Sequence, residues 1–458
     1  MQKLLKLFDE SLGKYLLTAI LLVVPLFPKF PAFRIPGTYV AVRLEDFLIL
    51  FVLLFFAIPI LQNIKNIFRN NVSRSILIFL GIGLVSLISG IYLTQTVDLK
   101  IGFLHWFRRV EYLSLFFVSF VYLRMNKDNN LFFDYVIKIL IIINLLVFGY
   151  GLGQKYIALP VIVTQNEEYS KGIALRWVPG AHINSTFAGH YDLASFMVLM
   201  LPIFITAFFV LKDEVIQNQK KQITSRFKIY YFVRNKTSKI ILGISVAFGF
   251  WLLSVAVSRI SIVAFIVAVS VSLLLYKKFK EIILFGIISV IIFGTAPDLQ
   301  VRYKRIFDVV KQKISSFIIV HAQENGNVNE DRSTSIRLNV EWPRAIRAFT
   351  KNPILGTGYS SITLATDNDY LRALGETGAF GLLSFLLIFI YLYQHLKSYV
   401  FDNSLKSIFI AGYIGSTVGI IMTAIFIDIF EASKFAIIYW MFTGLVVGSL
   451  KNKYEQIS

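Results

Sequence analysis

The chain has 458 residues, of which 56% are hydrophobic and 16% are charged, whereas soluble domains carry about 25% charged residues. This composition excludes a soluble enzyme, a disulfide-linked secreted module and a disordered protein. The absence of cysteine excludes a cysteine-ligated metal site and a thiol nucleophile, and the net charge of +19 raises the question of where the basic residues lie.

Twelve apolar segments follow one another along the chain. A helix needs about 20 apolar residues to cross a bilayer, and helices are expected because an open strand in lipid leaves backbone groups unpaired. We therefore predict an all-α polytopic membrane protein, with residues 1–458 forming a single integral membrane domain. The approximate cores are 15–30, 44–61, 76–93, 103–123, 133–153, 191–211, 239–257, 260–276, 281–295, 378–395, 408–430 and 435–450.

The lysines and arginines are distributed unevenly between the loops. With the N-terminus inside, the inner segments carry 23 of them and the short outer loops carry 9, as the positive-inside rule requires. This distribution predicts that both termini are cytoplasmic and that 212–239 is a basic cytoplasmic loop. The positive charge then reflects membrane orientation and anionic lipid, and no nucleic-acid partner is expected.

One large polar insertion, 296–377, lies between the ninth and tenth segments on the outer side. Residues 299–319 have the apolar periodicity of an amphipathic helix, 321–335 form a polar connector, and 334–350 are predicted to form a second, arginine-rich helix. A large outer loop rich in arginine favours an enzyme acting on the outer face. A non-catalytic extracytoplasmic domain is the alternative.

Arginines near the outer ends of helices are candidate anion-binding groups, since charge close to lipid is costly and usually functional. Arg259 occupies a tight turn between two apolar segments, where its alternative role is to reach lipid headgroups. Arg108 and Arg109 lie with His105 on one face of the fourth segment, near Glu111. This group is predicted to bind substrate phosphate or, alternatively, to anchor the helix at the interface, with Arg–Glu contacts that stay within the helix.

Four motifs occur in a fixed order. They are 184–194 (NSTFAGHYDLA), Ser258-Arg259, 352–358 (NPILGTG) with Arg337 upstream, and Asp367-Asn368 followed after nine residues by Gly378-Ala379-Phe380-Gly381. Together they resemble O-antigen ligases and polymerases, whose sixth helix starts with TF-x-G-x-x-x-x-A and whose large periplasmic loop contains NPxxGxG. Their twelve helices, with a large loop after the ninth, also match.

The resemblance implies a bacterial cytoplasmic-membrane glycosyltransferase of surface polysaccharide or lipopolysaccharide biosynthesis. Its substrate would be an undecaprenyl-pyrophosphate-linked oligosaccharide, transferred to a hydroxyl acceptor on the outer face. A chain-length regulator is a candidate partner. No metal or cofactor is expected, because arginine can stabilise the pyrophosphate leaving group. The ligase signature opens with His and this chain has Asp367, which favours a polymerase over a ligase.

The resemblance assigns three catalytic candidates: Arg259 and Arg337 for the pyrophosphate, and Asp367 as the base. Asp367 could instead cap the following helix, a role that Asp performs well. The predicted substrate-binding residues are Arg176, Arg108, Arg109, His190, Asp192, Asp369 and Tyr370. For His190 and Asp192, helix capping is the alternative role.

Two other classes of protein remain open from the sequence. A flippase or transporter of lipid-linked oligosaccharides can also have about twelve helices, although it is expected to place charges around a midplane cavity. A membrane scaffold of a polysaccharide export complex is the third hypothesis.

Overall fold

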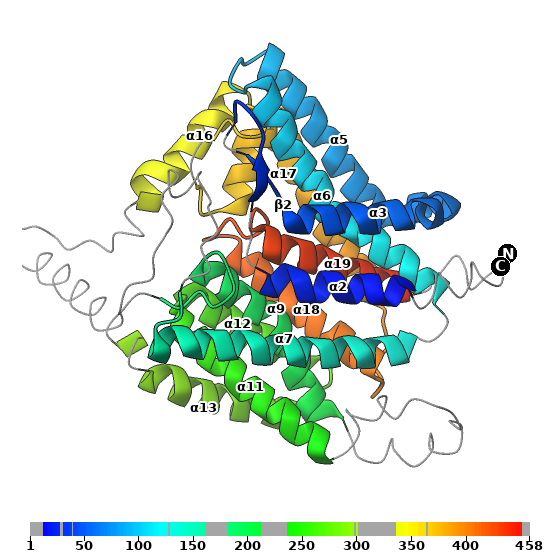
Figure 1. The fold of residues 1–458 in the computed structure, drawn as a ribbon, viewed down its shortest axis with the longest axis vertical. Coiled ribbons are helices and arrows are strands. Elements are labelled where there is room, and N and C mark those ends of the chain that lie inside the picture. The colour runs from blue at the N-terminus through cyan, green and yellow to red at the C-terminus, as the bar shows by residue number, and fades with distance from the viewer. Residues whose placement is uncertain are drawn as a thin grey trace, which may run out of the picture.

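The structure is a computed structural model that describes residues 12–27, 31–38, 40–126, 129–160, 182–211, 236–296, 299–300, 336–362 and 365–450. The described chain is almost entirely helical (Figure 1). The helices are α2 (Gly13–Leu26), α3 (Leu44–Gln62), α4 (Ile64–Arg69), α5 (Asn71–Tyr92), α6 (Leu99–Met125), α7 (Asn129–Ile157), α9 (His190–Val210), α11 (Lys236–Ala256), α12 (Arg259–Leu274), α13 (Phe279–Thr295), the π-helix η3 (Arg337–Glu341), α16 (Trp342–Lys351), α17 (Asp369–Leu396), α18 (Leu405–Thr423) and α19 (Ser433–Ser449). The strands β1 (Pro31–Arg34) and β2 (Ala41–Arg43) form an antiparallel hairpin between α2 and α3.

Each of the twelve apolar segments expected from the sequence coincides with a helix. By length and composition alone, seven helices in the described ranges could cross a membrane, namely α3, α5, α7, α9, α11, α17 and α18. Three shorter apolar helices, α2, α12 and α19, accompany them. The protein is therefore a multi-pass membrane protein, whereas the number of twelve spans remains a prediction.

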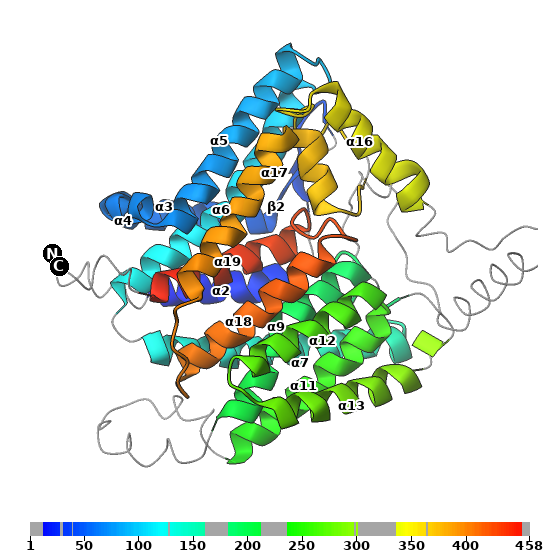
Figure 2. The same ribbon diagram turned by 180° about the vertical axis from the view of Figure 1, so that it is seen from behind.

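The centre of the bundle is formed by α9, α18 and α19, which are buried along most of their length. Figure 2 shows α18 and α9 between α19 on one side and α11 and α13 on the other. Gly444 and Gly448 of α19 lie directly on the backbone of Phe116 and Phe120 in α6. A small residue every fourth position allows two membrane helices to approach closely, so α6 and α19 pack side by side in the same direction.

Two boundaries differ from the expectation. The segment predicted over 408–430 is helical only to Thr423, and 424–432 form a loop before α19 in which 427–430 are buried. The segment predicted over 378–395 belongs to α17, which begins at Asp369 and is kinked at Gly378 (φ 69°, ψ −170°). The first prediction ran too far because the largely apolar residues 427–430 are buried within the protein. The second started too late because the first turns of α17 carry the charged residues Asp369, Arg372 and Glu376.

The polar insertion predicted over 296–377 is described only in part. Most of the amphipathic helix predicted over 299–319, and the whole connector 321–335, lie outside the described residues. The predicted second helix is present as η3 followed by α16, which packs against the start of α17 (Figure 1).

Candidate active site

Four segments meet at one end of the bundle. They are residues 182–190 before α9, the turn between α11 and α12, the chain from η3 to the start of α17, and the loop 424–432. The Ile183 amide donates to the Val255 carbonyl at 3.4 Å, and the Asp369 amide donates to the Ala424 carbonyl at 2.9 Å. These contacts bring together segments that are far apart in the sequence.

The NPxxGxG stretch packs backbone to backbone on the kink of α17. The Thr357 amide donates to the Gly375 carbonyl at 3.0 Å, and the Gly358 amide donates to the Glu376 carbonyl at 2.8 Å. A β-carbon added to Gly356 would lie 2.5 Å from the Gly378 nitrogen, and both glycines have positive φ, a conformation that glycine adopts without strain. The two glycine motifs thus contact each other directly through their backbones. This contact fixes the distance between the two ends of the loop that joins them.

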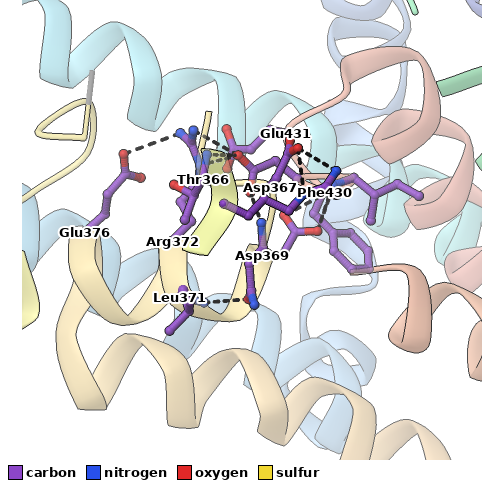
Figure 3. A network of polar contacts seen from close by, with 12 residues as sticks. Thr366, Asp367, Asp369, Leu371, Arg372, Glu376, Phe430 and Glu431 are labelled. Carbon is purple, nitrogen blue, oxygen red and sulfur yellow. Dashed lines mark hydrogen bonds and ion pairs between the residues drawn. The ribbon is translucent and has the colours of Figure 1, made fainter. Parts of the chain in front are cut away.

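Two aspartates join the start of α17 to the loop 424–432 reciprocally (Figure 3). Asp428 accepts hydrogen bonds from the amides of Thr366 at 2.7 Å and Asn368 at 2.8 Å. Asp369 accepts from the amides of Ile429 at 2.8 Å and Phe430 at 3.2 Å. This clasp holds Asp367 from both sides.

Asp367 forms an ion pair with Arg337. Nε and Nη2 of Arg337 both donate to Oδ2 of Asp367, at 3.0 and 2.7 Å, while Tyr191 at the start of α9 also hydrogen-bonds to Arg337. Asp367 has φ of 49°, which is uncommon outside glycine and is often found at functional sites. The side chain of Arg337 is 12% exposed and that of Asp367 is 26% exposed, so the pair is partly shielded from water.

Burial and neighbouring charges shift the ionisation of this group. Burial raises the pKa of Asp367 above its ordinary value, because the favourable charge of Arg337 offsets only part of the desolvation. Burial and the negative charge of Asp367 raise the pKa of Glu341 to about 7. Burial lowers the pKa of Arg337, but Asp367 and Tyr191 outweigh this and raise it overall, so the guanidinium stays protonated beside two carboxyl groups.

Such a group, with a fixed guanidinium and two carboxyls of raised pKa, is suited to binding an anionic leaving group and accepting a proton. A family model described as O-antigen ligase matches residues 244–386. Over these residues, the resemblance to the O-antigen ligase family is confirmed. No curated protein matches the chain. The match supports glycan transfer of the O-antigen ligase type in general, and the matched residues include Arg259, Arg337, Glu341 and Asp367.

The structure assigns the cap of α17 to a different residue from the one expected. Asn368 accepts the Leu371 amide at 2.9 Å and is the N-cap, whereas Asp367 points to Arg337. Asp369 and Tyr370, predicted to bind sugar hydroxyls, have other partners. Asp369 accepts hydrogen bonds from backbone amides of the loop 424–432, and the Tyr370 hydroxyl donates to the Ile421 carbonyl in the last turn of α18 at 2.8 Å.

Arg259 is the first residue of α12, and Ser258 precedes it with a 2.7 Å hydrogen bond to Ser261. His190 begins α9 and lies against His182, with ring centroids 4.6 Å apart. Asp192 is in the first turn of α9, and the N-cap position is occupied by Gly189, which has no side chain that could accept a cap hydrogen bond. Arg176 lies outside the described residues.

Arg108 and Arg109 have protein partners. Arg108 pairs with Asp46 at 2.8 Å and Glu111 at 2.9 Å, and Arg109 pairs with Glu431. Pairing within the helix was the expected alternative to phosphate binding, and the pair of Arg108 with Glu111 is of this kind. The other two partners, Asp46 and Glu431, come from outside α6.

Arg109 lies at a cavity of about 40 Å³, which Arg372, Glu376 and Tyr359 also line. This volume suits a few water molecules. The arginines predicted to bind phosphate therefore lie in two places. Arg337 lies beside Asp367, and Arg109 lies at this interior cavity.

Three residues of this region were missed in the sequence. Glu341 lies in an outer helix where charge is ordinary. Asp428 was placed inside an apolar segment, where an acidic residue near a helix end should have drawn notice. Lys434 is 2% exposed, and its ammonium donates to the carbonyls of Thr186 and, at 3.3 Å, Pro25. It holds the TFAG motif against α2.

Proposed function

We propose that this chain is a membrane glycosyltransferase that transfers a glycan from undecaprenyl pyrophosphate to a hydroxyl acceptor. The reaction takes place on the outer face of the bacterial cytoplasmic membrane, with twelve spans and both termini in the cytoplasm. A chain-length regulator is a candidate partner, and the substrate lipid reaches the site laterally from the bilayer.

The chemistry has two demands that this end of the bundle can meet. The acceptor oxygen forms a bond to the anomeric carbon, the bond from that carbon to the pyrophosphate oxygen breaks, and the electron pair leaves with the phosphate. Arg337, assisted by Arg259, stabilises the charge that develops there. The acceptor proton passes to a carboxylate, for which Asp367 and Glu341 are the two groups beside Arg337.

The observation that carries this proposal is the ion pair between Arg337 and Asp367, held by a clasp that joins the start of α17 to the loop 424–432. An ion pair fixed in this way costs little reorganisation when charge develops in the substrate. Asp367 stands where the ligase signature has His, so we assign the chain to polymerisation of repeat units in preference to ligation onto a lipid acceptor.

A flippase or transporter is the alternative function. Arg109, Arg372 and Glu376 do lie in helices around an interior cavity, as a transporter would require. However, a cavity of about 40 Å³ is far below the roughly 300 Å³ at which pockets begin to hold small organic ligands. The interior charges therefore support an enzyme with a rigid core better than a passage for sugars.

A strain lacking this gene tests the proposal through its surface glycan. A polymerase predicts loss of long chains, with a single repeat unit still attached to its acceptor. A ligase predicts that polymer accumulates on the lipid carrier. Repeat units that accumulate on the cytoplasmic face, where externally added glycosidases do not reach them, would indicate a flippase and contradict the proposal.

A further inference from the structure

The π-helix η3 places a second carboxyl group beside the Arg337–Asp367 pair. Glu341 follows Arg337 by four residues, and Arg344 follows Glu341 by three, so the three side chains share one side of η3 and α16. The charges of Asp367, Arg337, Asp428 and Arg344 all act on Glu341. Glu341 is thus part of this site, although no sequence motif includes it.

The polar atoms here include several without a hydrogen-bond partner among the described residues. They are Glu341 Oε2, Trp342 Nε1, Arg344 Nη1 and Thr366 Oγ1, all of them buried. Buried polar atoms are nearly always paired in native proteins, and an unpaired one requires an explanation. One acceptor and three donors around an ion pair have the chemistry that binds a hydroxyl-rich sugar.

The two carboxyls differ in how their oxygens are used. Oδ2 of Asp367 receives both hydrogen bonds from Arg337, so a proton accepted there would weaken the contact that orients the arginine. Oε2 of Glu341 receives none from the described residues. Asp367 is therefore placed to orient Arg337, and Glu341 is placed to accept a proton.

We infer that Glu341 is the catalytic base that accepts the proton of the acceptor hydroxyl, and that Asp367 is a positioning residue for Arg337. As the acceptor oxygen bonds to the anomeric carbon, its proton moves to Glu341 Oε2, and the electron pair of the broken bond leaves on the pyrophosphate beside Arg337. This inference rests on the proposed function.

The ionisation of Glu341 supports the same role. Burial, together with the charges of Asp367 and Asp428, raises its pKa to about 7, against the opposing effect of Arg337 and Arg344. A base with a pKa near the working pH is the most effective in general catalysis. The ionised fraction rises tenfold per pH unit below about 7 and levels off above it, so the transfer rate should follow the same curve.

The test is the pH dependence of single-turnover transfer. It uses the purified full chain in lipid vesicles, with the lipid-linked glycan extracted from the deletion strain as donor and acceptor. Glu341→Gln should lower the rate about 100-fold or more and abolish the rising limb of the curve of transfer rate against pH. Glu341→Asp, which keeps the carboxyl group, should recover part of the rate together with the limb.

Asp367→Asn is the matched comparison. It should lower the rate but keep the limb and move it to lower pH, because removing the Asp367 charge relieves the repulsion that raises the pKa of Glu341. Unchanged thermal unfolding of each variant in detergent establishes that it is folded. A wild-type protein that transfers no glycan would refute both the proposed function and this inference. If the wild type is active, a rising limb that persists in full in Glu341→Gln overturns the inference alone. Loss of the rising limb in Asp367→Asn would overturn it as well.

Discussion

Arg337 donates two hydrogen bonds to one oxygen of Asp367, from Nε at 3.0 Å and from Nη2 at 2.7 Å. The two residues are 30 residues apart in the sequence, with Arg337 in η3 and Asp367 just before α17. These two bonds and the hydrogen bond with Tyr191 use three of the five guanidinium N–H groups, so the same arginine can still bind a phosphate oxygen. This geometry gives the arginine a fixed direction before any substrate binds.

Replacing Arg337 should therefore remove both its positive charge and its oriented hydrogen-bond donors. Arg337→Ala is expected to lower the rate of glycan transfer by about 100-fold or more, the usual effect of losing one transition-state donor. Arg337→Lys keeps the charge but not the planar fork, so it should recover only a small part of the rate. Product length on gels, normalised to protein in the membrane, measures this. Full activity in both variants would exclude Arg337 from the chemistry.

The clasp can be opened at Asp428. Asp428→Asn removes the negative charge that pairs with Arg372, whose Nε and Nη2 lie 3.2 and 3.1 Å from Oδ2, and it weakens both amide contacts. Breaking a buried ion pair by removing one partner costs about 3–5 kcal/mol. We expect a lower unfolding temperature in detergent and reduced transfer. Leu→Met changes on the lipid face of α3, such as Leu54→Met, serve as the control and should change neither.

The contact between the two glycine motifs can be tested at Gly378. A β-carbon there would meet the Ile354 carbonyl, and the φ of 69° would add strain. Gly378→Ala should destabilise the protein by about 2 kcal/mol or more and lower its amount in the membrane. Gly286→Ala on α13, where nothing lies within 4 Å of the added carbon, is the matched control. Equal levels of the two variants would mean that the kink is not needed.

Arg109 was expected to bind phosphate, whereas the structure pairs it with Glu431. Arg109→Met alone should destabilise the fold by up to about 3 kcal/mol, because it leaves the partly buried Glu431, 18% exposed, without its counter-charge. The double variant Arg109→Met/Glu431→Met should restore most of that stability, as apolar replacements of buried pairs often do. Thermal unfolding separates the two cases. A stable double variant without activity would return Arg109 to substrate binding.

The helices were predictable from the sequence because a bilayer demands apolar runs of a certain length, and all twelve predicted segments coincide with helices. What failed was the loop 424–432, which is apolar like a membrane segment but packs against α17 and α19. Composition alone cannot distinguish burial in protein from burial in lipid. For the same reason Asp428 was not recognised as a structural group.

The candidate site was predictable only where a motif marked it. Arg337 and Asp367 were expected in one site, and the structure brings them into contact. Glu341 was not expected in the site, because it is about 25 residues from Asp367 in the sequence. Only the folding back of the chain brings its helical turn to face Asp367. Charge partners across such distances in sequence are not encoded in local spacing.

The most direct test of the central claim is release of undecaprenyl pyrophosphate by the purified chain in lipid vesicles. The donor is the lipid-linked glycan from the deletion strain, and no other protein is added. The account predicts that wild type releases the lipid pyrophosphate together with a longer glycan, whereas Arg337→Ala, present at equal amount, releases neither. Intact donor that is merely moved across the vesicle membrane by both proteins would contradict it.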